Sequence, residues 1–146
     1  MVAVGHAVRI TTRSDAGRAA IEDVGAECWV GTPDRLATLR GALDSVTIAC
    51  WLLGSAVGPE DAVSALHGTR LELFLTQAID TTVRGLIYEA RGTSTPPGDL
   101  RAGERIVRTI TTRNEIPVAF LSTDPSDHAG WLAGASGAVE SLLARA

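Results

Sequence analysis

The side chains that could do chemistry include an unusual basic set. All 13 basic residues of this 146-residue chain are arginines, and none is a lysine. The chain therefore has no side-chain amine for Schiff-base formation or for a phosphate loop of the G-x-x-x-x-G-K-[ST] type. It also has no amine that could lower the pKa of a neighbouring tyrosine. Reactions that depend on a lysine side chain are excluded.

Cysteine and histidine are too few and too scattered to predict a metal site. Cys28 and Cys50 both lie in apolar runs, which leaves two interpretations: a disulfide or metal pair, or two small buried thiols. The second is favoured, because free cysteines are among the residues most often buried. His6, His67 and His128 show no metal-ligand spacing. We predict that the chain binds no metal.

The other polar groups form no known catalytic set. No serine lies in a G-x-S-x-G elbow, and no histidine lies near a nucleophile and an acid in the sequence. His67 is predicted to be a surface or packing residue, and His128 to be neutral at a helix start. Asp80–Thr82 and Ser122–Asp124 contain acids and hydroxyls, and the proline after the second group indicates a turn. The catalytic residues stay unassigned.

The composition is typical of a globular chain, with 45% hydrophobic residues, 21% charged residues and a net charge of -4. Without a long basic run, a nucleic acid is excluded as the main partner. No stretch approaches the roughly 20 apolar residues of a membrane span. The N-terminus is too short for a signal peptide. We therefore predict no membrane partner and a cytoplasmic location.

Short apolar runs, which predict strands, alternate with amphipathic stretches, which predict helices. The predicted strands are residues 7–10, 28–30, 46–53, 86–88 and 117–121. The predicted helices are residues 14–24, 32–43, 59–78, 99–110 and 127–142, with Ser14 and Thr32 as N-caps. This alternation predicts one α/β domain over residues 1–146, a three-layer fold with a mostly parallel sheet of about five strands.

Ligands of such a fold bind beyond the carboxyl ends of the strands. Five segments are expected to line that edge of the sheet: Thr11–Ser14, Gly31–Asp34, Leu53–Ala56, Ala90–Thr93 and Ser122–Pro125.

Four stretches in this order resemble parts of an NAD(P)-binding Rossmann domain. Gly5–Arg13 resembles its second strand, Gly25–Gly31 its third, Leu36–Val46 the following helix and its exit, and Leu52–Gly54 the end of its fourth strand. Together they are similar to the atypical and extended short-chain dehydrogenase/reductases, a family of epimerase-like and reductase-like proteins. The resemblance implies a Rossmann-like fold and an NAD(P) cofactor.

The family's opening unit has no counterpart here. Its first strand ends in a G-x-x-G-x-x-G loop, where the backbone holds the cofactor's pyrophosphate at a helix N-terminus. Residues 1–6 resemble instead the end of the first helix, so about 25 residues of strand, loop and helix are missing relative to the family. In the strand order 3-2-1-4-5-6 the missing strand is the central one. We therefore expect a gap in the sheet and a chain truncated at its N-terminus relative to the family.

The resemblance assigns cofactor-binding positions to the strand ends. Arg13, Ser14 and Arg18 follow the second strand, where arginine favours the extra phosphate of NADP over NAD; the alternative is solvated surface arginines. Gly31 matches a Gly-Asp pair that contacts adenine, with Thr32 in place of the acid; the alternative is a helix cap.

The end of the fourth strand supplies the remaining positions. Leu53, Gly54 and Ser55 stand where the ribose side of the cofactor would pass, and the alternative is a simple turn.

The family's Tyr-x-x-x-Lys pair is absent, since position 92 is Gly92 and no lysine exists. Tyr88, the single tyrosine, is predicted to be structural. The glycines of residues 130–137 are predicted to lie in a helix and allow close packing rather than to form a phosphate loop.

The sequence thus predicts an NAD(P)-binding Rossmann-like protein, in the oxidoreductase or epimerase class if it is an enzyme, with cofactor binding weakened or lost. Two alternatives stay open. One is a non-catalytic remnant that acts in regulation or oligomerisation, because an exposed central strand edge favours pairing with another chain or rearrangement. The other is an unrelated doubly wound domain with its own small ligand.

Overall fold

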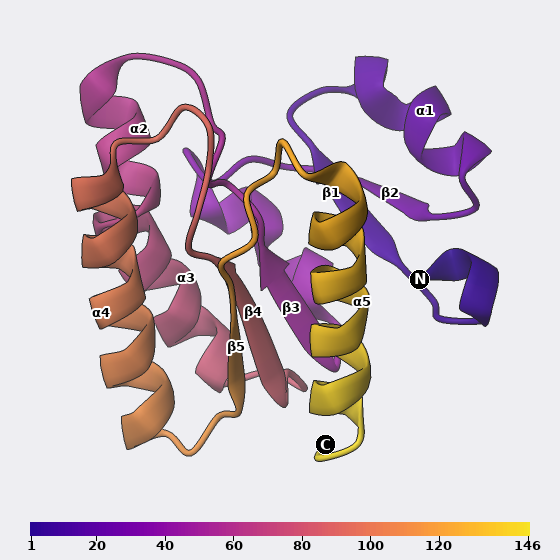
Figure 1. Ribbon diagram of the computed structural model, residues 1–146. Coiled ribbons are helices and arrows are strands. Elements are labelled where there is room, and N and C mark those ends of the chain that lie inside the picture. Colours follow the sequence, from indigo (N-terminus) through magenta and orange to yellow (C-terminus); the bar gives the residue numbers. More distant parts are fainter.

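Parallel strands form the middle of the molecule, as the computed structural model describes it over residues 1–146. The strands are β1 (Arg9–Thr12), β2 (Glu27–Val30), β3 (Ile48–Trp51), β4 (Gly85–Glu89) and β5 (Val118–Leu121). Every paired strand is parallel to its neighbour. The loops that follow the strands gather at one end of the molecule, the upper end in Figure 1.

The sheet is interrupted between β1 and β3. One piece contains β1 and β2, and the other has the order β3-β4-β5. In the order 3-2-1-4-5-6, β2 and β1 take the places of strands 3 and 2, and β3, β4 and β5 those of strands 4, 5 and 6. The interruption falls at the place of strand 1. The predicted parallel α/β fold, with its first strand missing, is confirmed.

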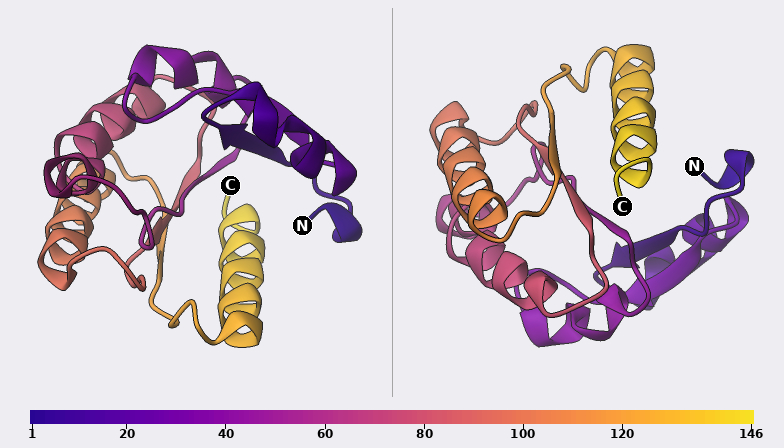
Figure 2. Two further views of the ribbon diagram at one scale, coloured as in Figure 1. Left: turned by 90° about the horizontal axis from the view of Figure 1, so that it is seen from above. Right: turned by 90° about the horizontal axis from the view of Figure 1, so that it is seen from below.

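The strands are flanked by five α-helices. They are α1 (Arg18–Asp23), α2 (Glu60–Leu66), α3 (Thr69–Ile79), α4 (Pro97–Arg113) and α5 (His128–Leu143). Figure 2 shows α3 and α4 on one side of β3-β4-β5 and α5 on the other, which gives three layers. None of these helices is long and apolar enough to cross a membrane.

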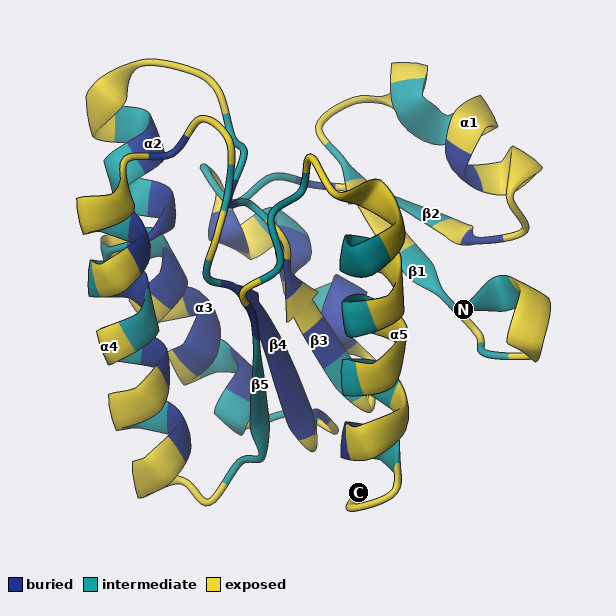
Figure 3. Cartoon of the chain, in the orientation of Figure 1, coloured by how far each residue is buried: buried dark blue, intermediate teal, exposed yellow.

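β4 is the most completely buried element. All five of its residues are buried, as the dark strand in Figure 3 shows. Leu86 and Tyr88 face the larger core, which contains Phe74 and Val107 from α3 and α4. Ile87 faces the smaller core under α5. An apolar run is required here, because a strand with neighbours on both sides and helices on both faces has no contact with water.

The first residues form one helical turn that leads into β1. Val2–Val4 is a 3-10 helix (η1), and Gly5 ends it with φ 92°. Glycine is the usual residue at a left-handed position after a helix C-terminus. This geometry agrees with the prediction that residues 1–6 resemble the end of a helix.

The predicted helix over residues 32–43 is wrong. The chain forms two 3-10 helices instead, η3 (Leu36–Leu39) and η4 (Gly41–Leu43). The Trp29 indole N–H donates to the Thr38 carbonyl at 2.8 Å, and the Thr38 N–H bonds to Arg35 three residues back. These bonds replace the four-residue spacing that an α-helix requires.

The single long helix predicted over residues 59–78 is in fact two. α2 ends at Leu66 and α3 begins at Thr69, and the chain breaks at His67 and Gly68. The His67 ring turns inward to bond with Tyr88, and Gly68 has φ -128° and ψ -111°, outside the helical region. A buried polar contact therefore decides the break.

Two smaller predictions also need correction. Ser14 precedes a 3-10 helix, η2 (Asp15–Gly17), and makes no capping bond with its side chain. Cys28 is half-buried and Cys50 is exposed, so the prediction of two buried thiols is wrong for Cys50. Both cysteines are free. The Cys50 side chain alternates with that of Ala49 in the larger core, so it points to the opposite face of β3, where it is exposed.

Gly103 of α4 makes room for the Tyr88 hydroxyl, since a Cβ atom at Gly103 would overlap it. We expect Gly103→Ala to lower the free energy of unfolding by about 1–3 kcal/mol, the usual cost of overpacking. Gly98→Ala in the same helix is the control, because nothing lies within 4 Å of its Cβ. Denaturant unfolding of both variants measures the difference. Equal effects of the two substitutions would contradict this packing.

Candidate functional site

Polar side chains at the carboxyl ends of the strands form two separate groups. The β1–β2 cluster consists of Arg13, Thr32 and Asp34. The β3–β5 cluster consists of Gly54, Glu89, Arg91, Asp124 and Trp131. No hydrogen bond or ion pair joins the two clusters, and the interruption of the sheet lies between them.

Arg13 is the cation of the β1–β2 cluster, and it is accessible to solvent. Its Nη1 lies 3.3 Å from Asp34 Oδ2, and its side chain is 69% exposed. An exposed pair of this kind contributes little to stability. The guanidinium can therefore exchange Asp34 for a more highly charged anion such as a phosphate.

The second predicted arginine is already occupied. Arg18 Nε donates to Asp15 at 2.7 Å, and its Nη1 lies 3.4 Å from Glu22. The Asp15 and Glu22 hydrogen bonds raise its pKa further above the ordinary value. Arg18 thus serves the local structure around α1. Neighbouring Ser14 receives a bond only at its carbonyl, from the Thr12 hydroxyl.

Gly31 and Thr32 form a tight turn after β2. The Thr32 N–H donates to Thr38 Oγ1 at 2.9 Å, and Thr32 Oγ1 accepts from the Asp34 N–H at 3.3 Å. A Cβ atom at Gly31 would lie 2.8 Å from the Thr38 carbonyl oxygen. The predicted helix cap at Thr32 is therefore a cap of this turn, and the close approach at Gly31 is to the chain itself.

Glu89 holds the centre of the β3–β5 cluster and was not singled out from the sequence. The residue is only 5% exposed at the end of β4. Its Oε2 accepts from the Gly54 N–H at 2.7 Å, and its Oε1 accepts from the Trp131 indole N–H at 2.9 Å. The carboxyl group thus joins β4 to the loop after β3 and to α5. Both of its oxygens are paired, as a buried carboxyl group requires.

Two glycines allow the loops after β3 and β4 to touch. A Cβ atom at Gly92 would overlap the Gly54 carbonyl, and one at Gly54 would lie 2.7 Å from the Arg91 carbonyl. The Thr93 N–H also donates to Ser55 Oγ at 3.0 Å. Gly54 and Ser55 thus connect two loops, which agrees with the structural alternative for these predicted cofactor positions.

The Leu53 carbonyl is held from below by His67. His67 is 1% exposed, its Nε2 lies 3.1 Å from Leu53 O, and its Nδ1 lies 2.7 Å from Tyr88 Oη. The Tyr88 hydroxyl also bonds to Leu100 O at 3.2 Å. His67 is therefore a packing residue, one of its two predicted roles, but it is fully buried. The prediction of Tyr88 as a structural residue is confirmed by its complete burial.

Burial sets the charge states in this contact. Desolvation lowers the pKa of His67 below its ordinary value of 6.5 and raises the pKa of Tyr88. Both groups are uncharged at neutral pH. Neither side chain reaches the surface where a ligand would bind.

The loop after β5 completes the edge. Arg91 Nη2 donates to Asp124 Oδ2 at 2.8 Å, and Ser126 donates to Asp124 Oδ1 through its hydroxyl and its N–H. The Ser126 bonds and Arg91 lower the pKa of Asp124. The turn predicted at this position is confirmed. The glycines of residues 130–137 lie in α5, as predicted, and form no anion cradle.

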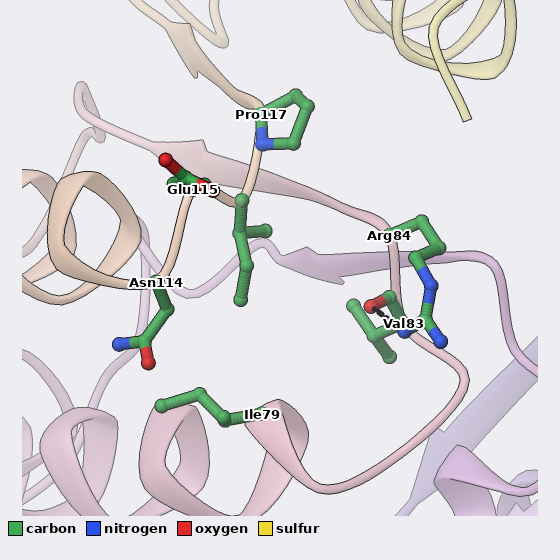
Figure 4. Close-up of a pocket in the computed structure, with 7 residues that line it drawn as sticks. Ile79, Val83, Arg84, Asn114, Glu115 and Pro117 are labelled. Carbon is green, nitrogen blue, oxygen red and sulfur yellow. Dashed lines mark hydrogen bonds between the residues drawn. The ribbon is translucent and has the colours of Figure 1, made fainter.

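A hollow lies at the opposite edge of the sheet. The hollow has a volume of about 260 Å³. The residues that line it, drawn in Figure 4, are Ile79, Val83, Arg84, Asn114, Glu115, Ile116 and Pro117. Its one cation, Arg84, donates to the carbonyls of Thr81 and Val83. No three His, Cys, Asp or Glu side chains are grouped to hold a metal anywhere in the chain. The carboxyl edge remains the candidate site.

Comparisons with known proteins give a likeness of structure alone. No protein-family model matches the chain, and no curated protein matches it by sequence. The Citrobacter sp. triphenylmethane reductase, solved in complex with NADP(H), superposes with a TM-score of 0.60 at 19% identity. The protein gox2253 superposes with a TM-score of 0.61 at 20% identity.

The likeness covers most of this chain but only part of the other two. It includes 79% of this chain and 39% of the reductase, and 82% of this chain and 44% of gox2253. The chain thus spans less than half the length of either protein. The Rossmann-like fold is shown by these superpositions, and the role of each predicted site residue remains a prediction.

Glu89→Ala leaves the N–H groups of Gly54 and Trp131 without an acceptor in a buried region. We expect it to reduce the free energy of unfolding by about 2–4 kcal/mol, because each unpaired buried donor costs about 1–3 kcal/mol. Glu104→Gln, which removes the charge from a surface pair with Arg108, is the control and should change stability by under about 0.5 kcal/mol.

A double-mutant cycle of Glu89→Ala with Trp131→Phe isolates the indole bond, measured by denaturant unfolding. The two substitutions share this one bond, so their effects should be less than additive. Full additivity would contradict the contact.

His67 predicts a pH dependence of stability. Its pKa is lower in the folded than in the unfolded protein, so unfolding takes up a proton and stability rises with pH. This contribution is complete above pH 6.5 and is lost as the pH falls toward the folded pKa. Unfolding between pH 5 and 7.5 measures it for the parent, for His67→Gln and for the exposed-histidine control His128→Gln. The slope should flatten only in His67→Gln, and an unchanged slope there would refute the assignment.

Proposed function

We propose that this chain is the larger part of an NADP-binding Rossmann-type unit. The observation that carries the proposal is the superposition on a reductase solved with NADP(H), together with an accessible arginine at the end of β1. In the proposed mode Arg13 binds the phosphate on the cofactor's adenosine ribose. The turn at Gly31 and Thr32 lies beside the adenine.

The residues fit one end of the dinucleotide and not its middle. Arg13 offers an exposed guanidinium, which suits a phosphate. For the pyrophosphate no comparable group exists, since the Gly54 N–H is bonded to Glu89 and the glycines after β5 lie within α5. We therefore propose that the cofactor binds weakly to this chain alone, through its phosphorylated ribose.

For catalysis we propose NADP-dependent oxidoreduction or an epimerase-like reaction. Tyr88 supplies no catalytic group, because its hydroxyl is buried and bonded to His67 and Leu100. A non-catalytic role is the second candidate. It is favoured by the same burial of Tyr88 and by the absence of any lysine.

Titration with nucleotides tests the proposal. NADPH and 2′-AMP are added to the chain while the fluorescence of Trp29 and Trp51 is followed, with NADH and 5′-AMP as the comparison ligands. We expect affinity weaker than micromolar for all four, with the 2′-phosphorylated ligands bound more tightly. Arg13→Ala should abolish that preference, worth about tenfold for one charge-assisted phosphate contact.

The control variant is Arg113→Ala, which removes an exposed arginine from the last turn of α4, at the far end of the molecule. It should retain the preference for the 2′-phosphate. Micromolar binding of NADPH by the parent chain would contradict the proposal that this chain has no binding group for the pyrophosphate. A preference that survives in Arg13→Ala would contradict the role of Arg13.

A further inference from the structure

Two neighbouring strands each have one backbone edge without a partner. β1 pairs only with β2, and β3 pairs only with β4. Both strands are four residues long, and each is parallel to its one partner. Figure 1 shows β3 between β4 and β1 in the middle of the fold. We call these two unpaired edges together the strand slot.

The hydrogen-bond register identifies the unpaired groups of β1. The N–H groups of Glu27 and Gly31 donate to the carbonyls of Val8 and Thr12. Since bonding alternates along a parallel strand, the even-numbered residues of β1 face β2. The N–H and C=O groups of Arg9 and Thr11 therefore face the slot.

The same reasoning applies to β3. The Thr47 carbonyl accepts from the Arg84 N–H next to β4, so Thr47, Ala49 and Trp51 face β4. The backbone groups of Ile48 and Cys50 then face the slot. Each edge thus offers two donors and two acceptors. A strand is the one ligand that satisfies a row of this kind along its whole length.

One face of the slot is apolar and uncovered. Ile10 is opposite Cys28 in the register, and Thr11 is opposite Trp29, which packs toward the α3 side. Ile10 therefore points to the α5 side of the sheet, where it is 38% exposed. Cys50 points the same way, because it alternates with Ala49 of the larger core, and it is exposed too.

The helical turn at the start of the chain lies beside this face. His6 Nε2 lies 2.7 Å from Glu140 Oε1, which places the residue after this turn beside α5. Val2–Val4 ends at Gly5 in the left-handed conformation that follows a helix. A helix lying over Ile10 and Cys50 would meet this turn.

We propose that the strand slot binds a polypeptide segment consisting of a short apolar β-strand followed by an amphipathic helix. The strand runs parallel between β1 and β3 and pairs with the four slot-facing residues. The helix covers Ile10 and Cys50 between α5 and the Val2–Val4 turn. The proposal does not depend on nucleotide binding.

A synthetic peptide of about 25 residues tests the slot. It carries a Val- and Ile-rich strand, a loop without glycine clusters and an Ala-, Leu- and Glu-rich helix. The control peptide has the same composition, with proline at two strand positions, which removes ladder donors. Amide hydrogen exchange of the 146-residue chain is followed by NMR, with and without each peptide.

In the chain alone, we expect the amides of Arg9, Thr11, Ile48 and Cys50 to exchange faster than those of Ala49 and Trp51. The strand peptide should slow the four slot-facing amides by at least about tenfold, and the proline peptide should not. Slowing by neither peptide, or equally by both, would overturn the proposal. Protection of the four amides without peptide would also overturn the proposal. Sedimentation would then show whether β1 and β3 pair directly in a monomer or pair in a dimer of this chain.

A pair of variants tests the apolar face. Ile10→Asp places a charge under the docked helix and should weaken peptide binding about tenfold or more. Leu73→Asp, at an exposed leucine of α3 on the opposite side of the sheet, should bind the peptide like the parent. Equal binding by both variants would refute the proposed position of the helix.

Discussion

Backbone hydrogen bonding across a parallel sheet is the constraint on which this structure depends. Every N–H and C=O group of a strand needs a partner or water, so a strand can be buried only where its neighbours are present on both sides. β4 meets that condition and is buried throughout. β1 and β3 do not meet it, and both expose residues that an intact sheet would cover.

The same constraint explains how many contacts connect the loops in each half of the carboxyl edge. Around β4, where the ladder is continuous, the loops after β3, β4 and β5 are tied together by Glu89, by the Gly54–Gly92 approach and by the Arg91–Asp124 pair. His67 supports this region from the core. Around β1 and β2 the ties are a local turn at Thr32 and one exposed pair between Arg13 and Asp34.

This division sets what each half can do with a ligand. The polar groups of the β3–β5 cluster are largely hydrogen-bonded within the chain itself, so the cluster has few free donors for a ligand. The β1–β2 cluster keeps an accessible guanidinium. Between the clusters lies the interruption where a Rossmann fold holds the pyrophosphate. A dinucleotide would therefore contact the chain mainly through one of its two ends, the phosphorylated ribose.

The sequence by itself determined the fold class, the strands and the missing central strand. Apolar runs bounded by glycine and amphipathic stretches fix strands and helices locally, and the order of those runs implies parallel pairing. The burial of Tyr88 followed from its place within a short apolar strand. The sequence pattern predicted the wrong helices where side chains from other segments change the local structure. This happened at the Trp29–Thr38 bond and at His67.

Only the tertiary structure decided which polar groups are free. Glu89 follows an apolar strand, and no spacing in the sequence links it to Gly54 and Trp131, which lie 35 and 42 residues away. Arg13 and Arg18 look alike in the sequence, yet Arg18 is bound by two carboxylates of its own helix region, whereas Arg13 has one exposed pair with Asp34. Availability for a ligand depends on these long-range and competing contacts, and residue type and spacing do not encode them.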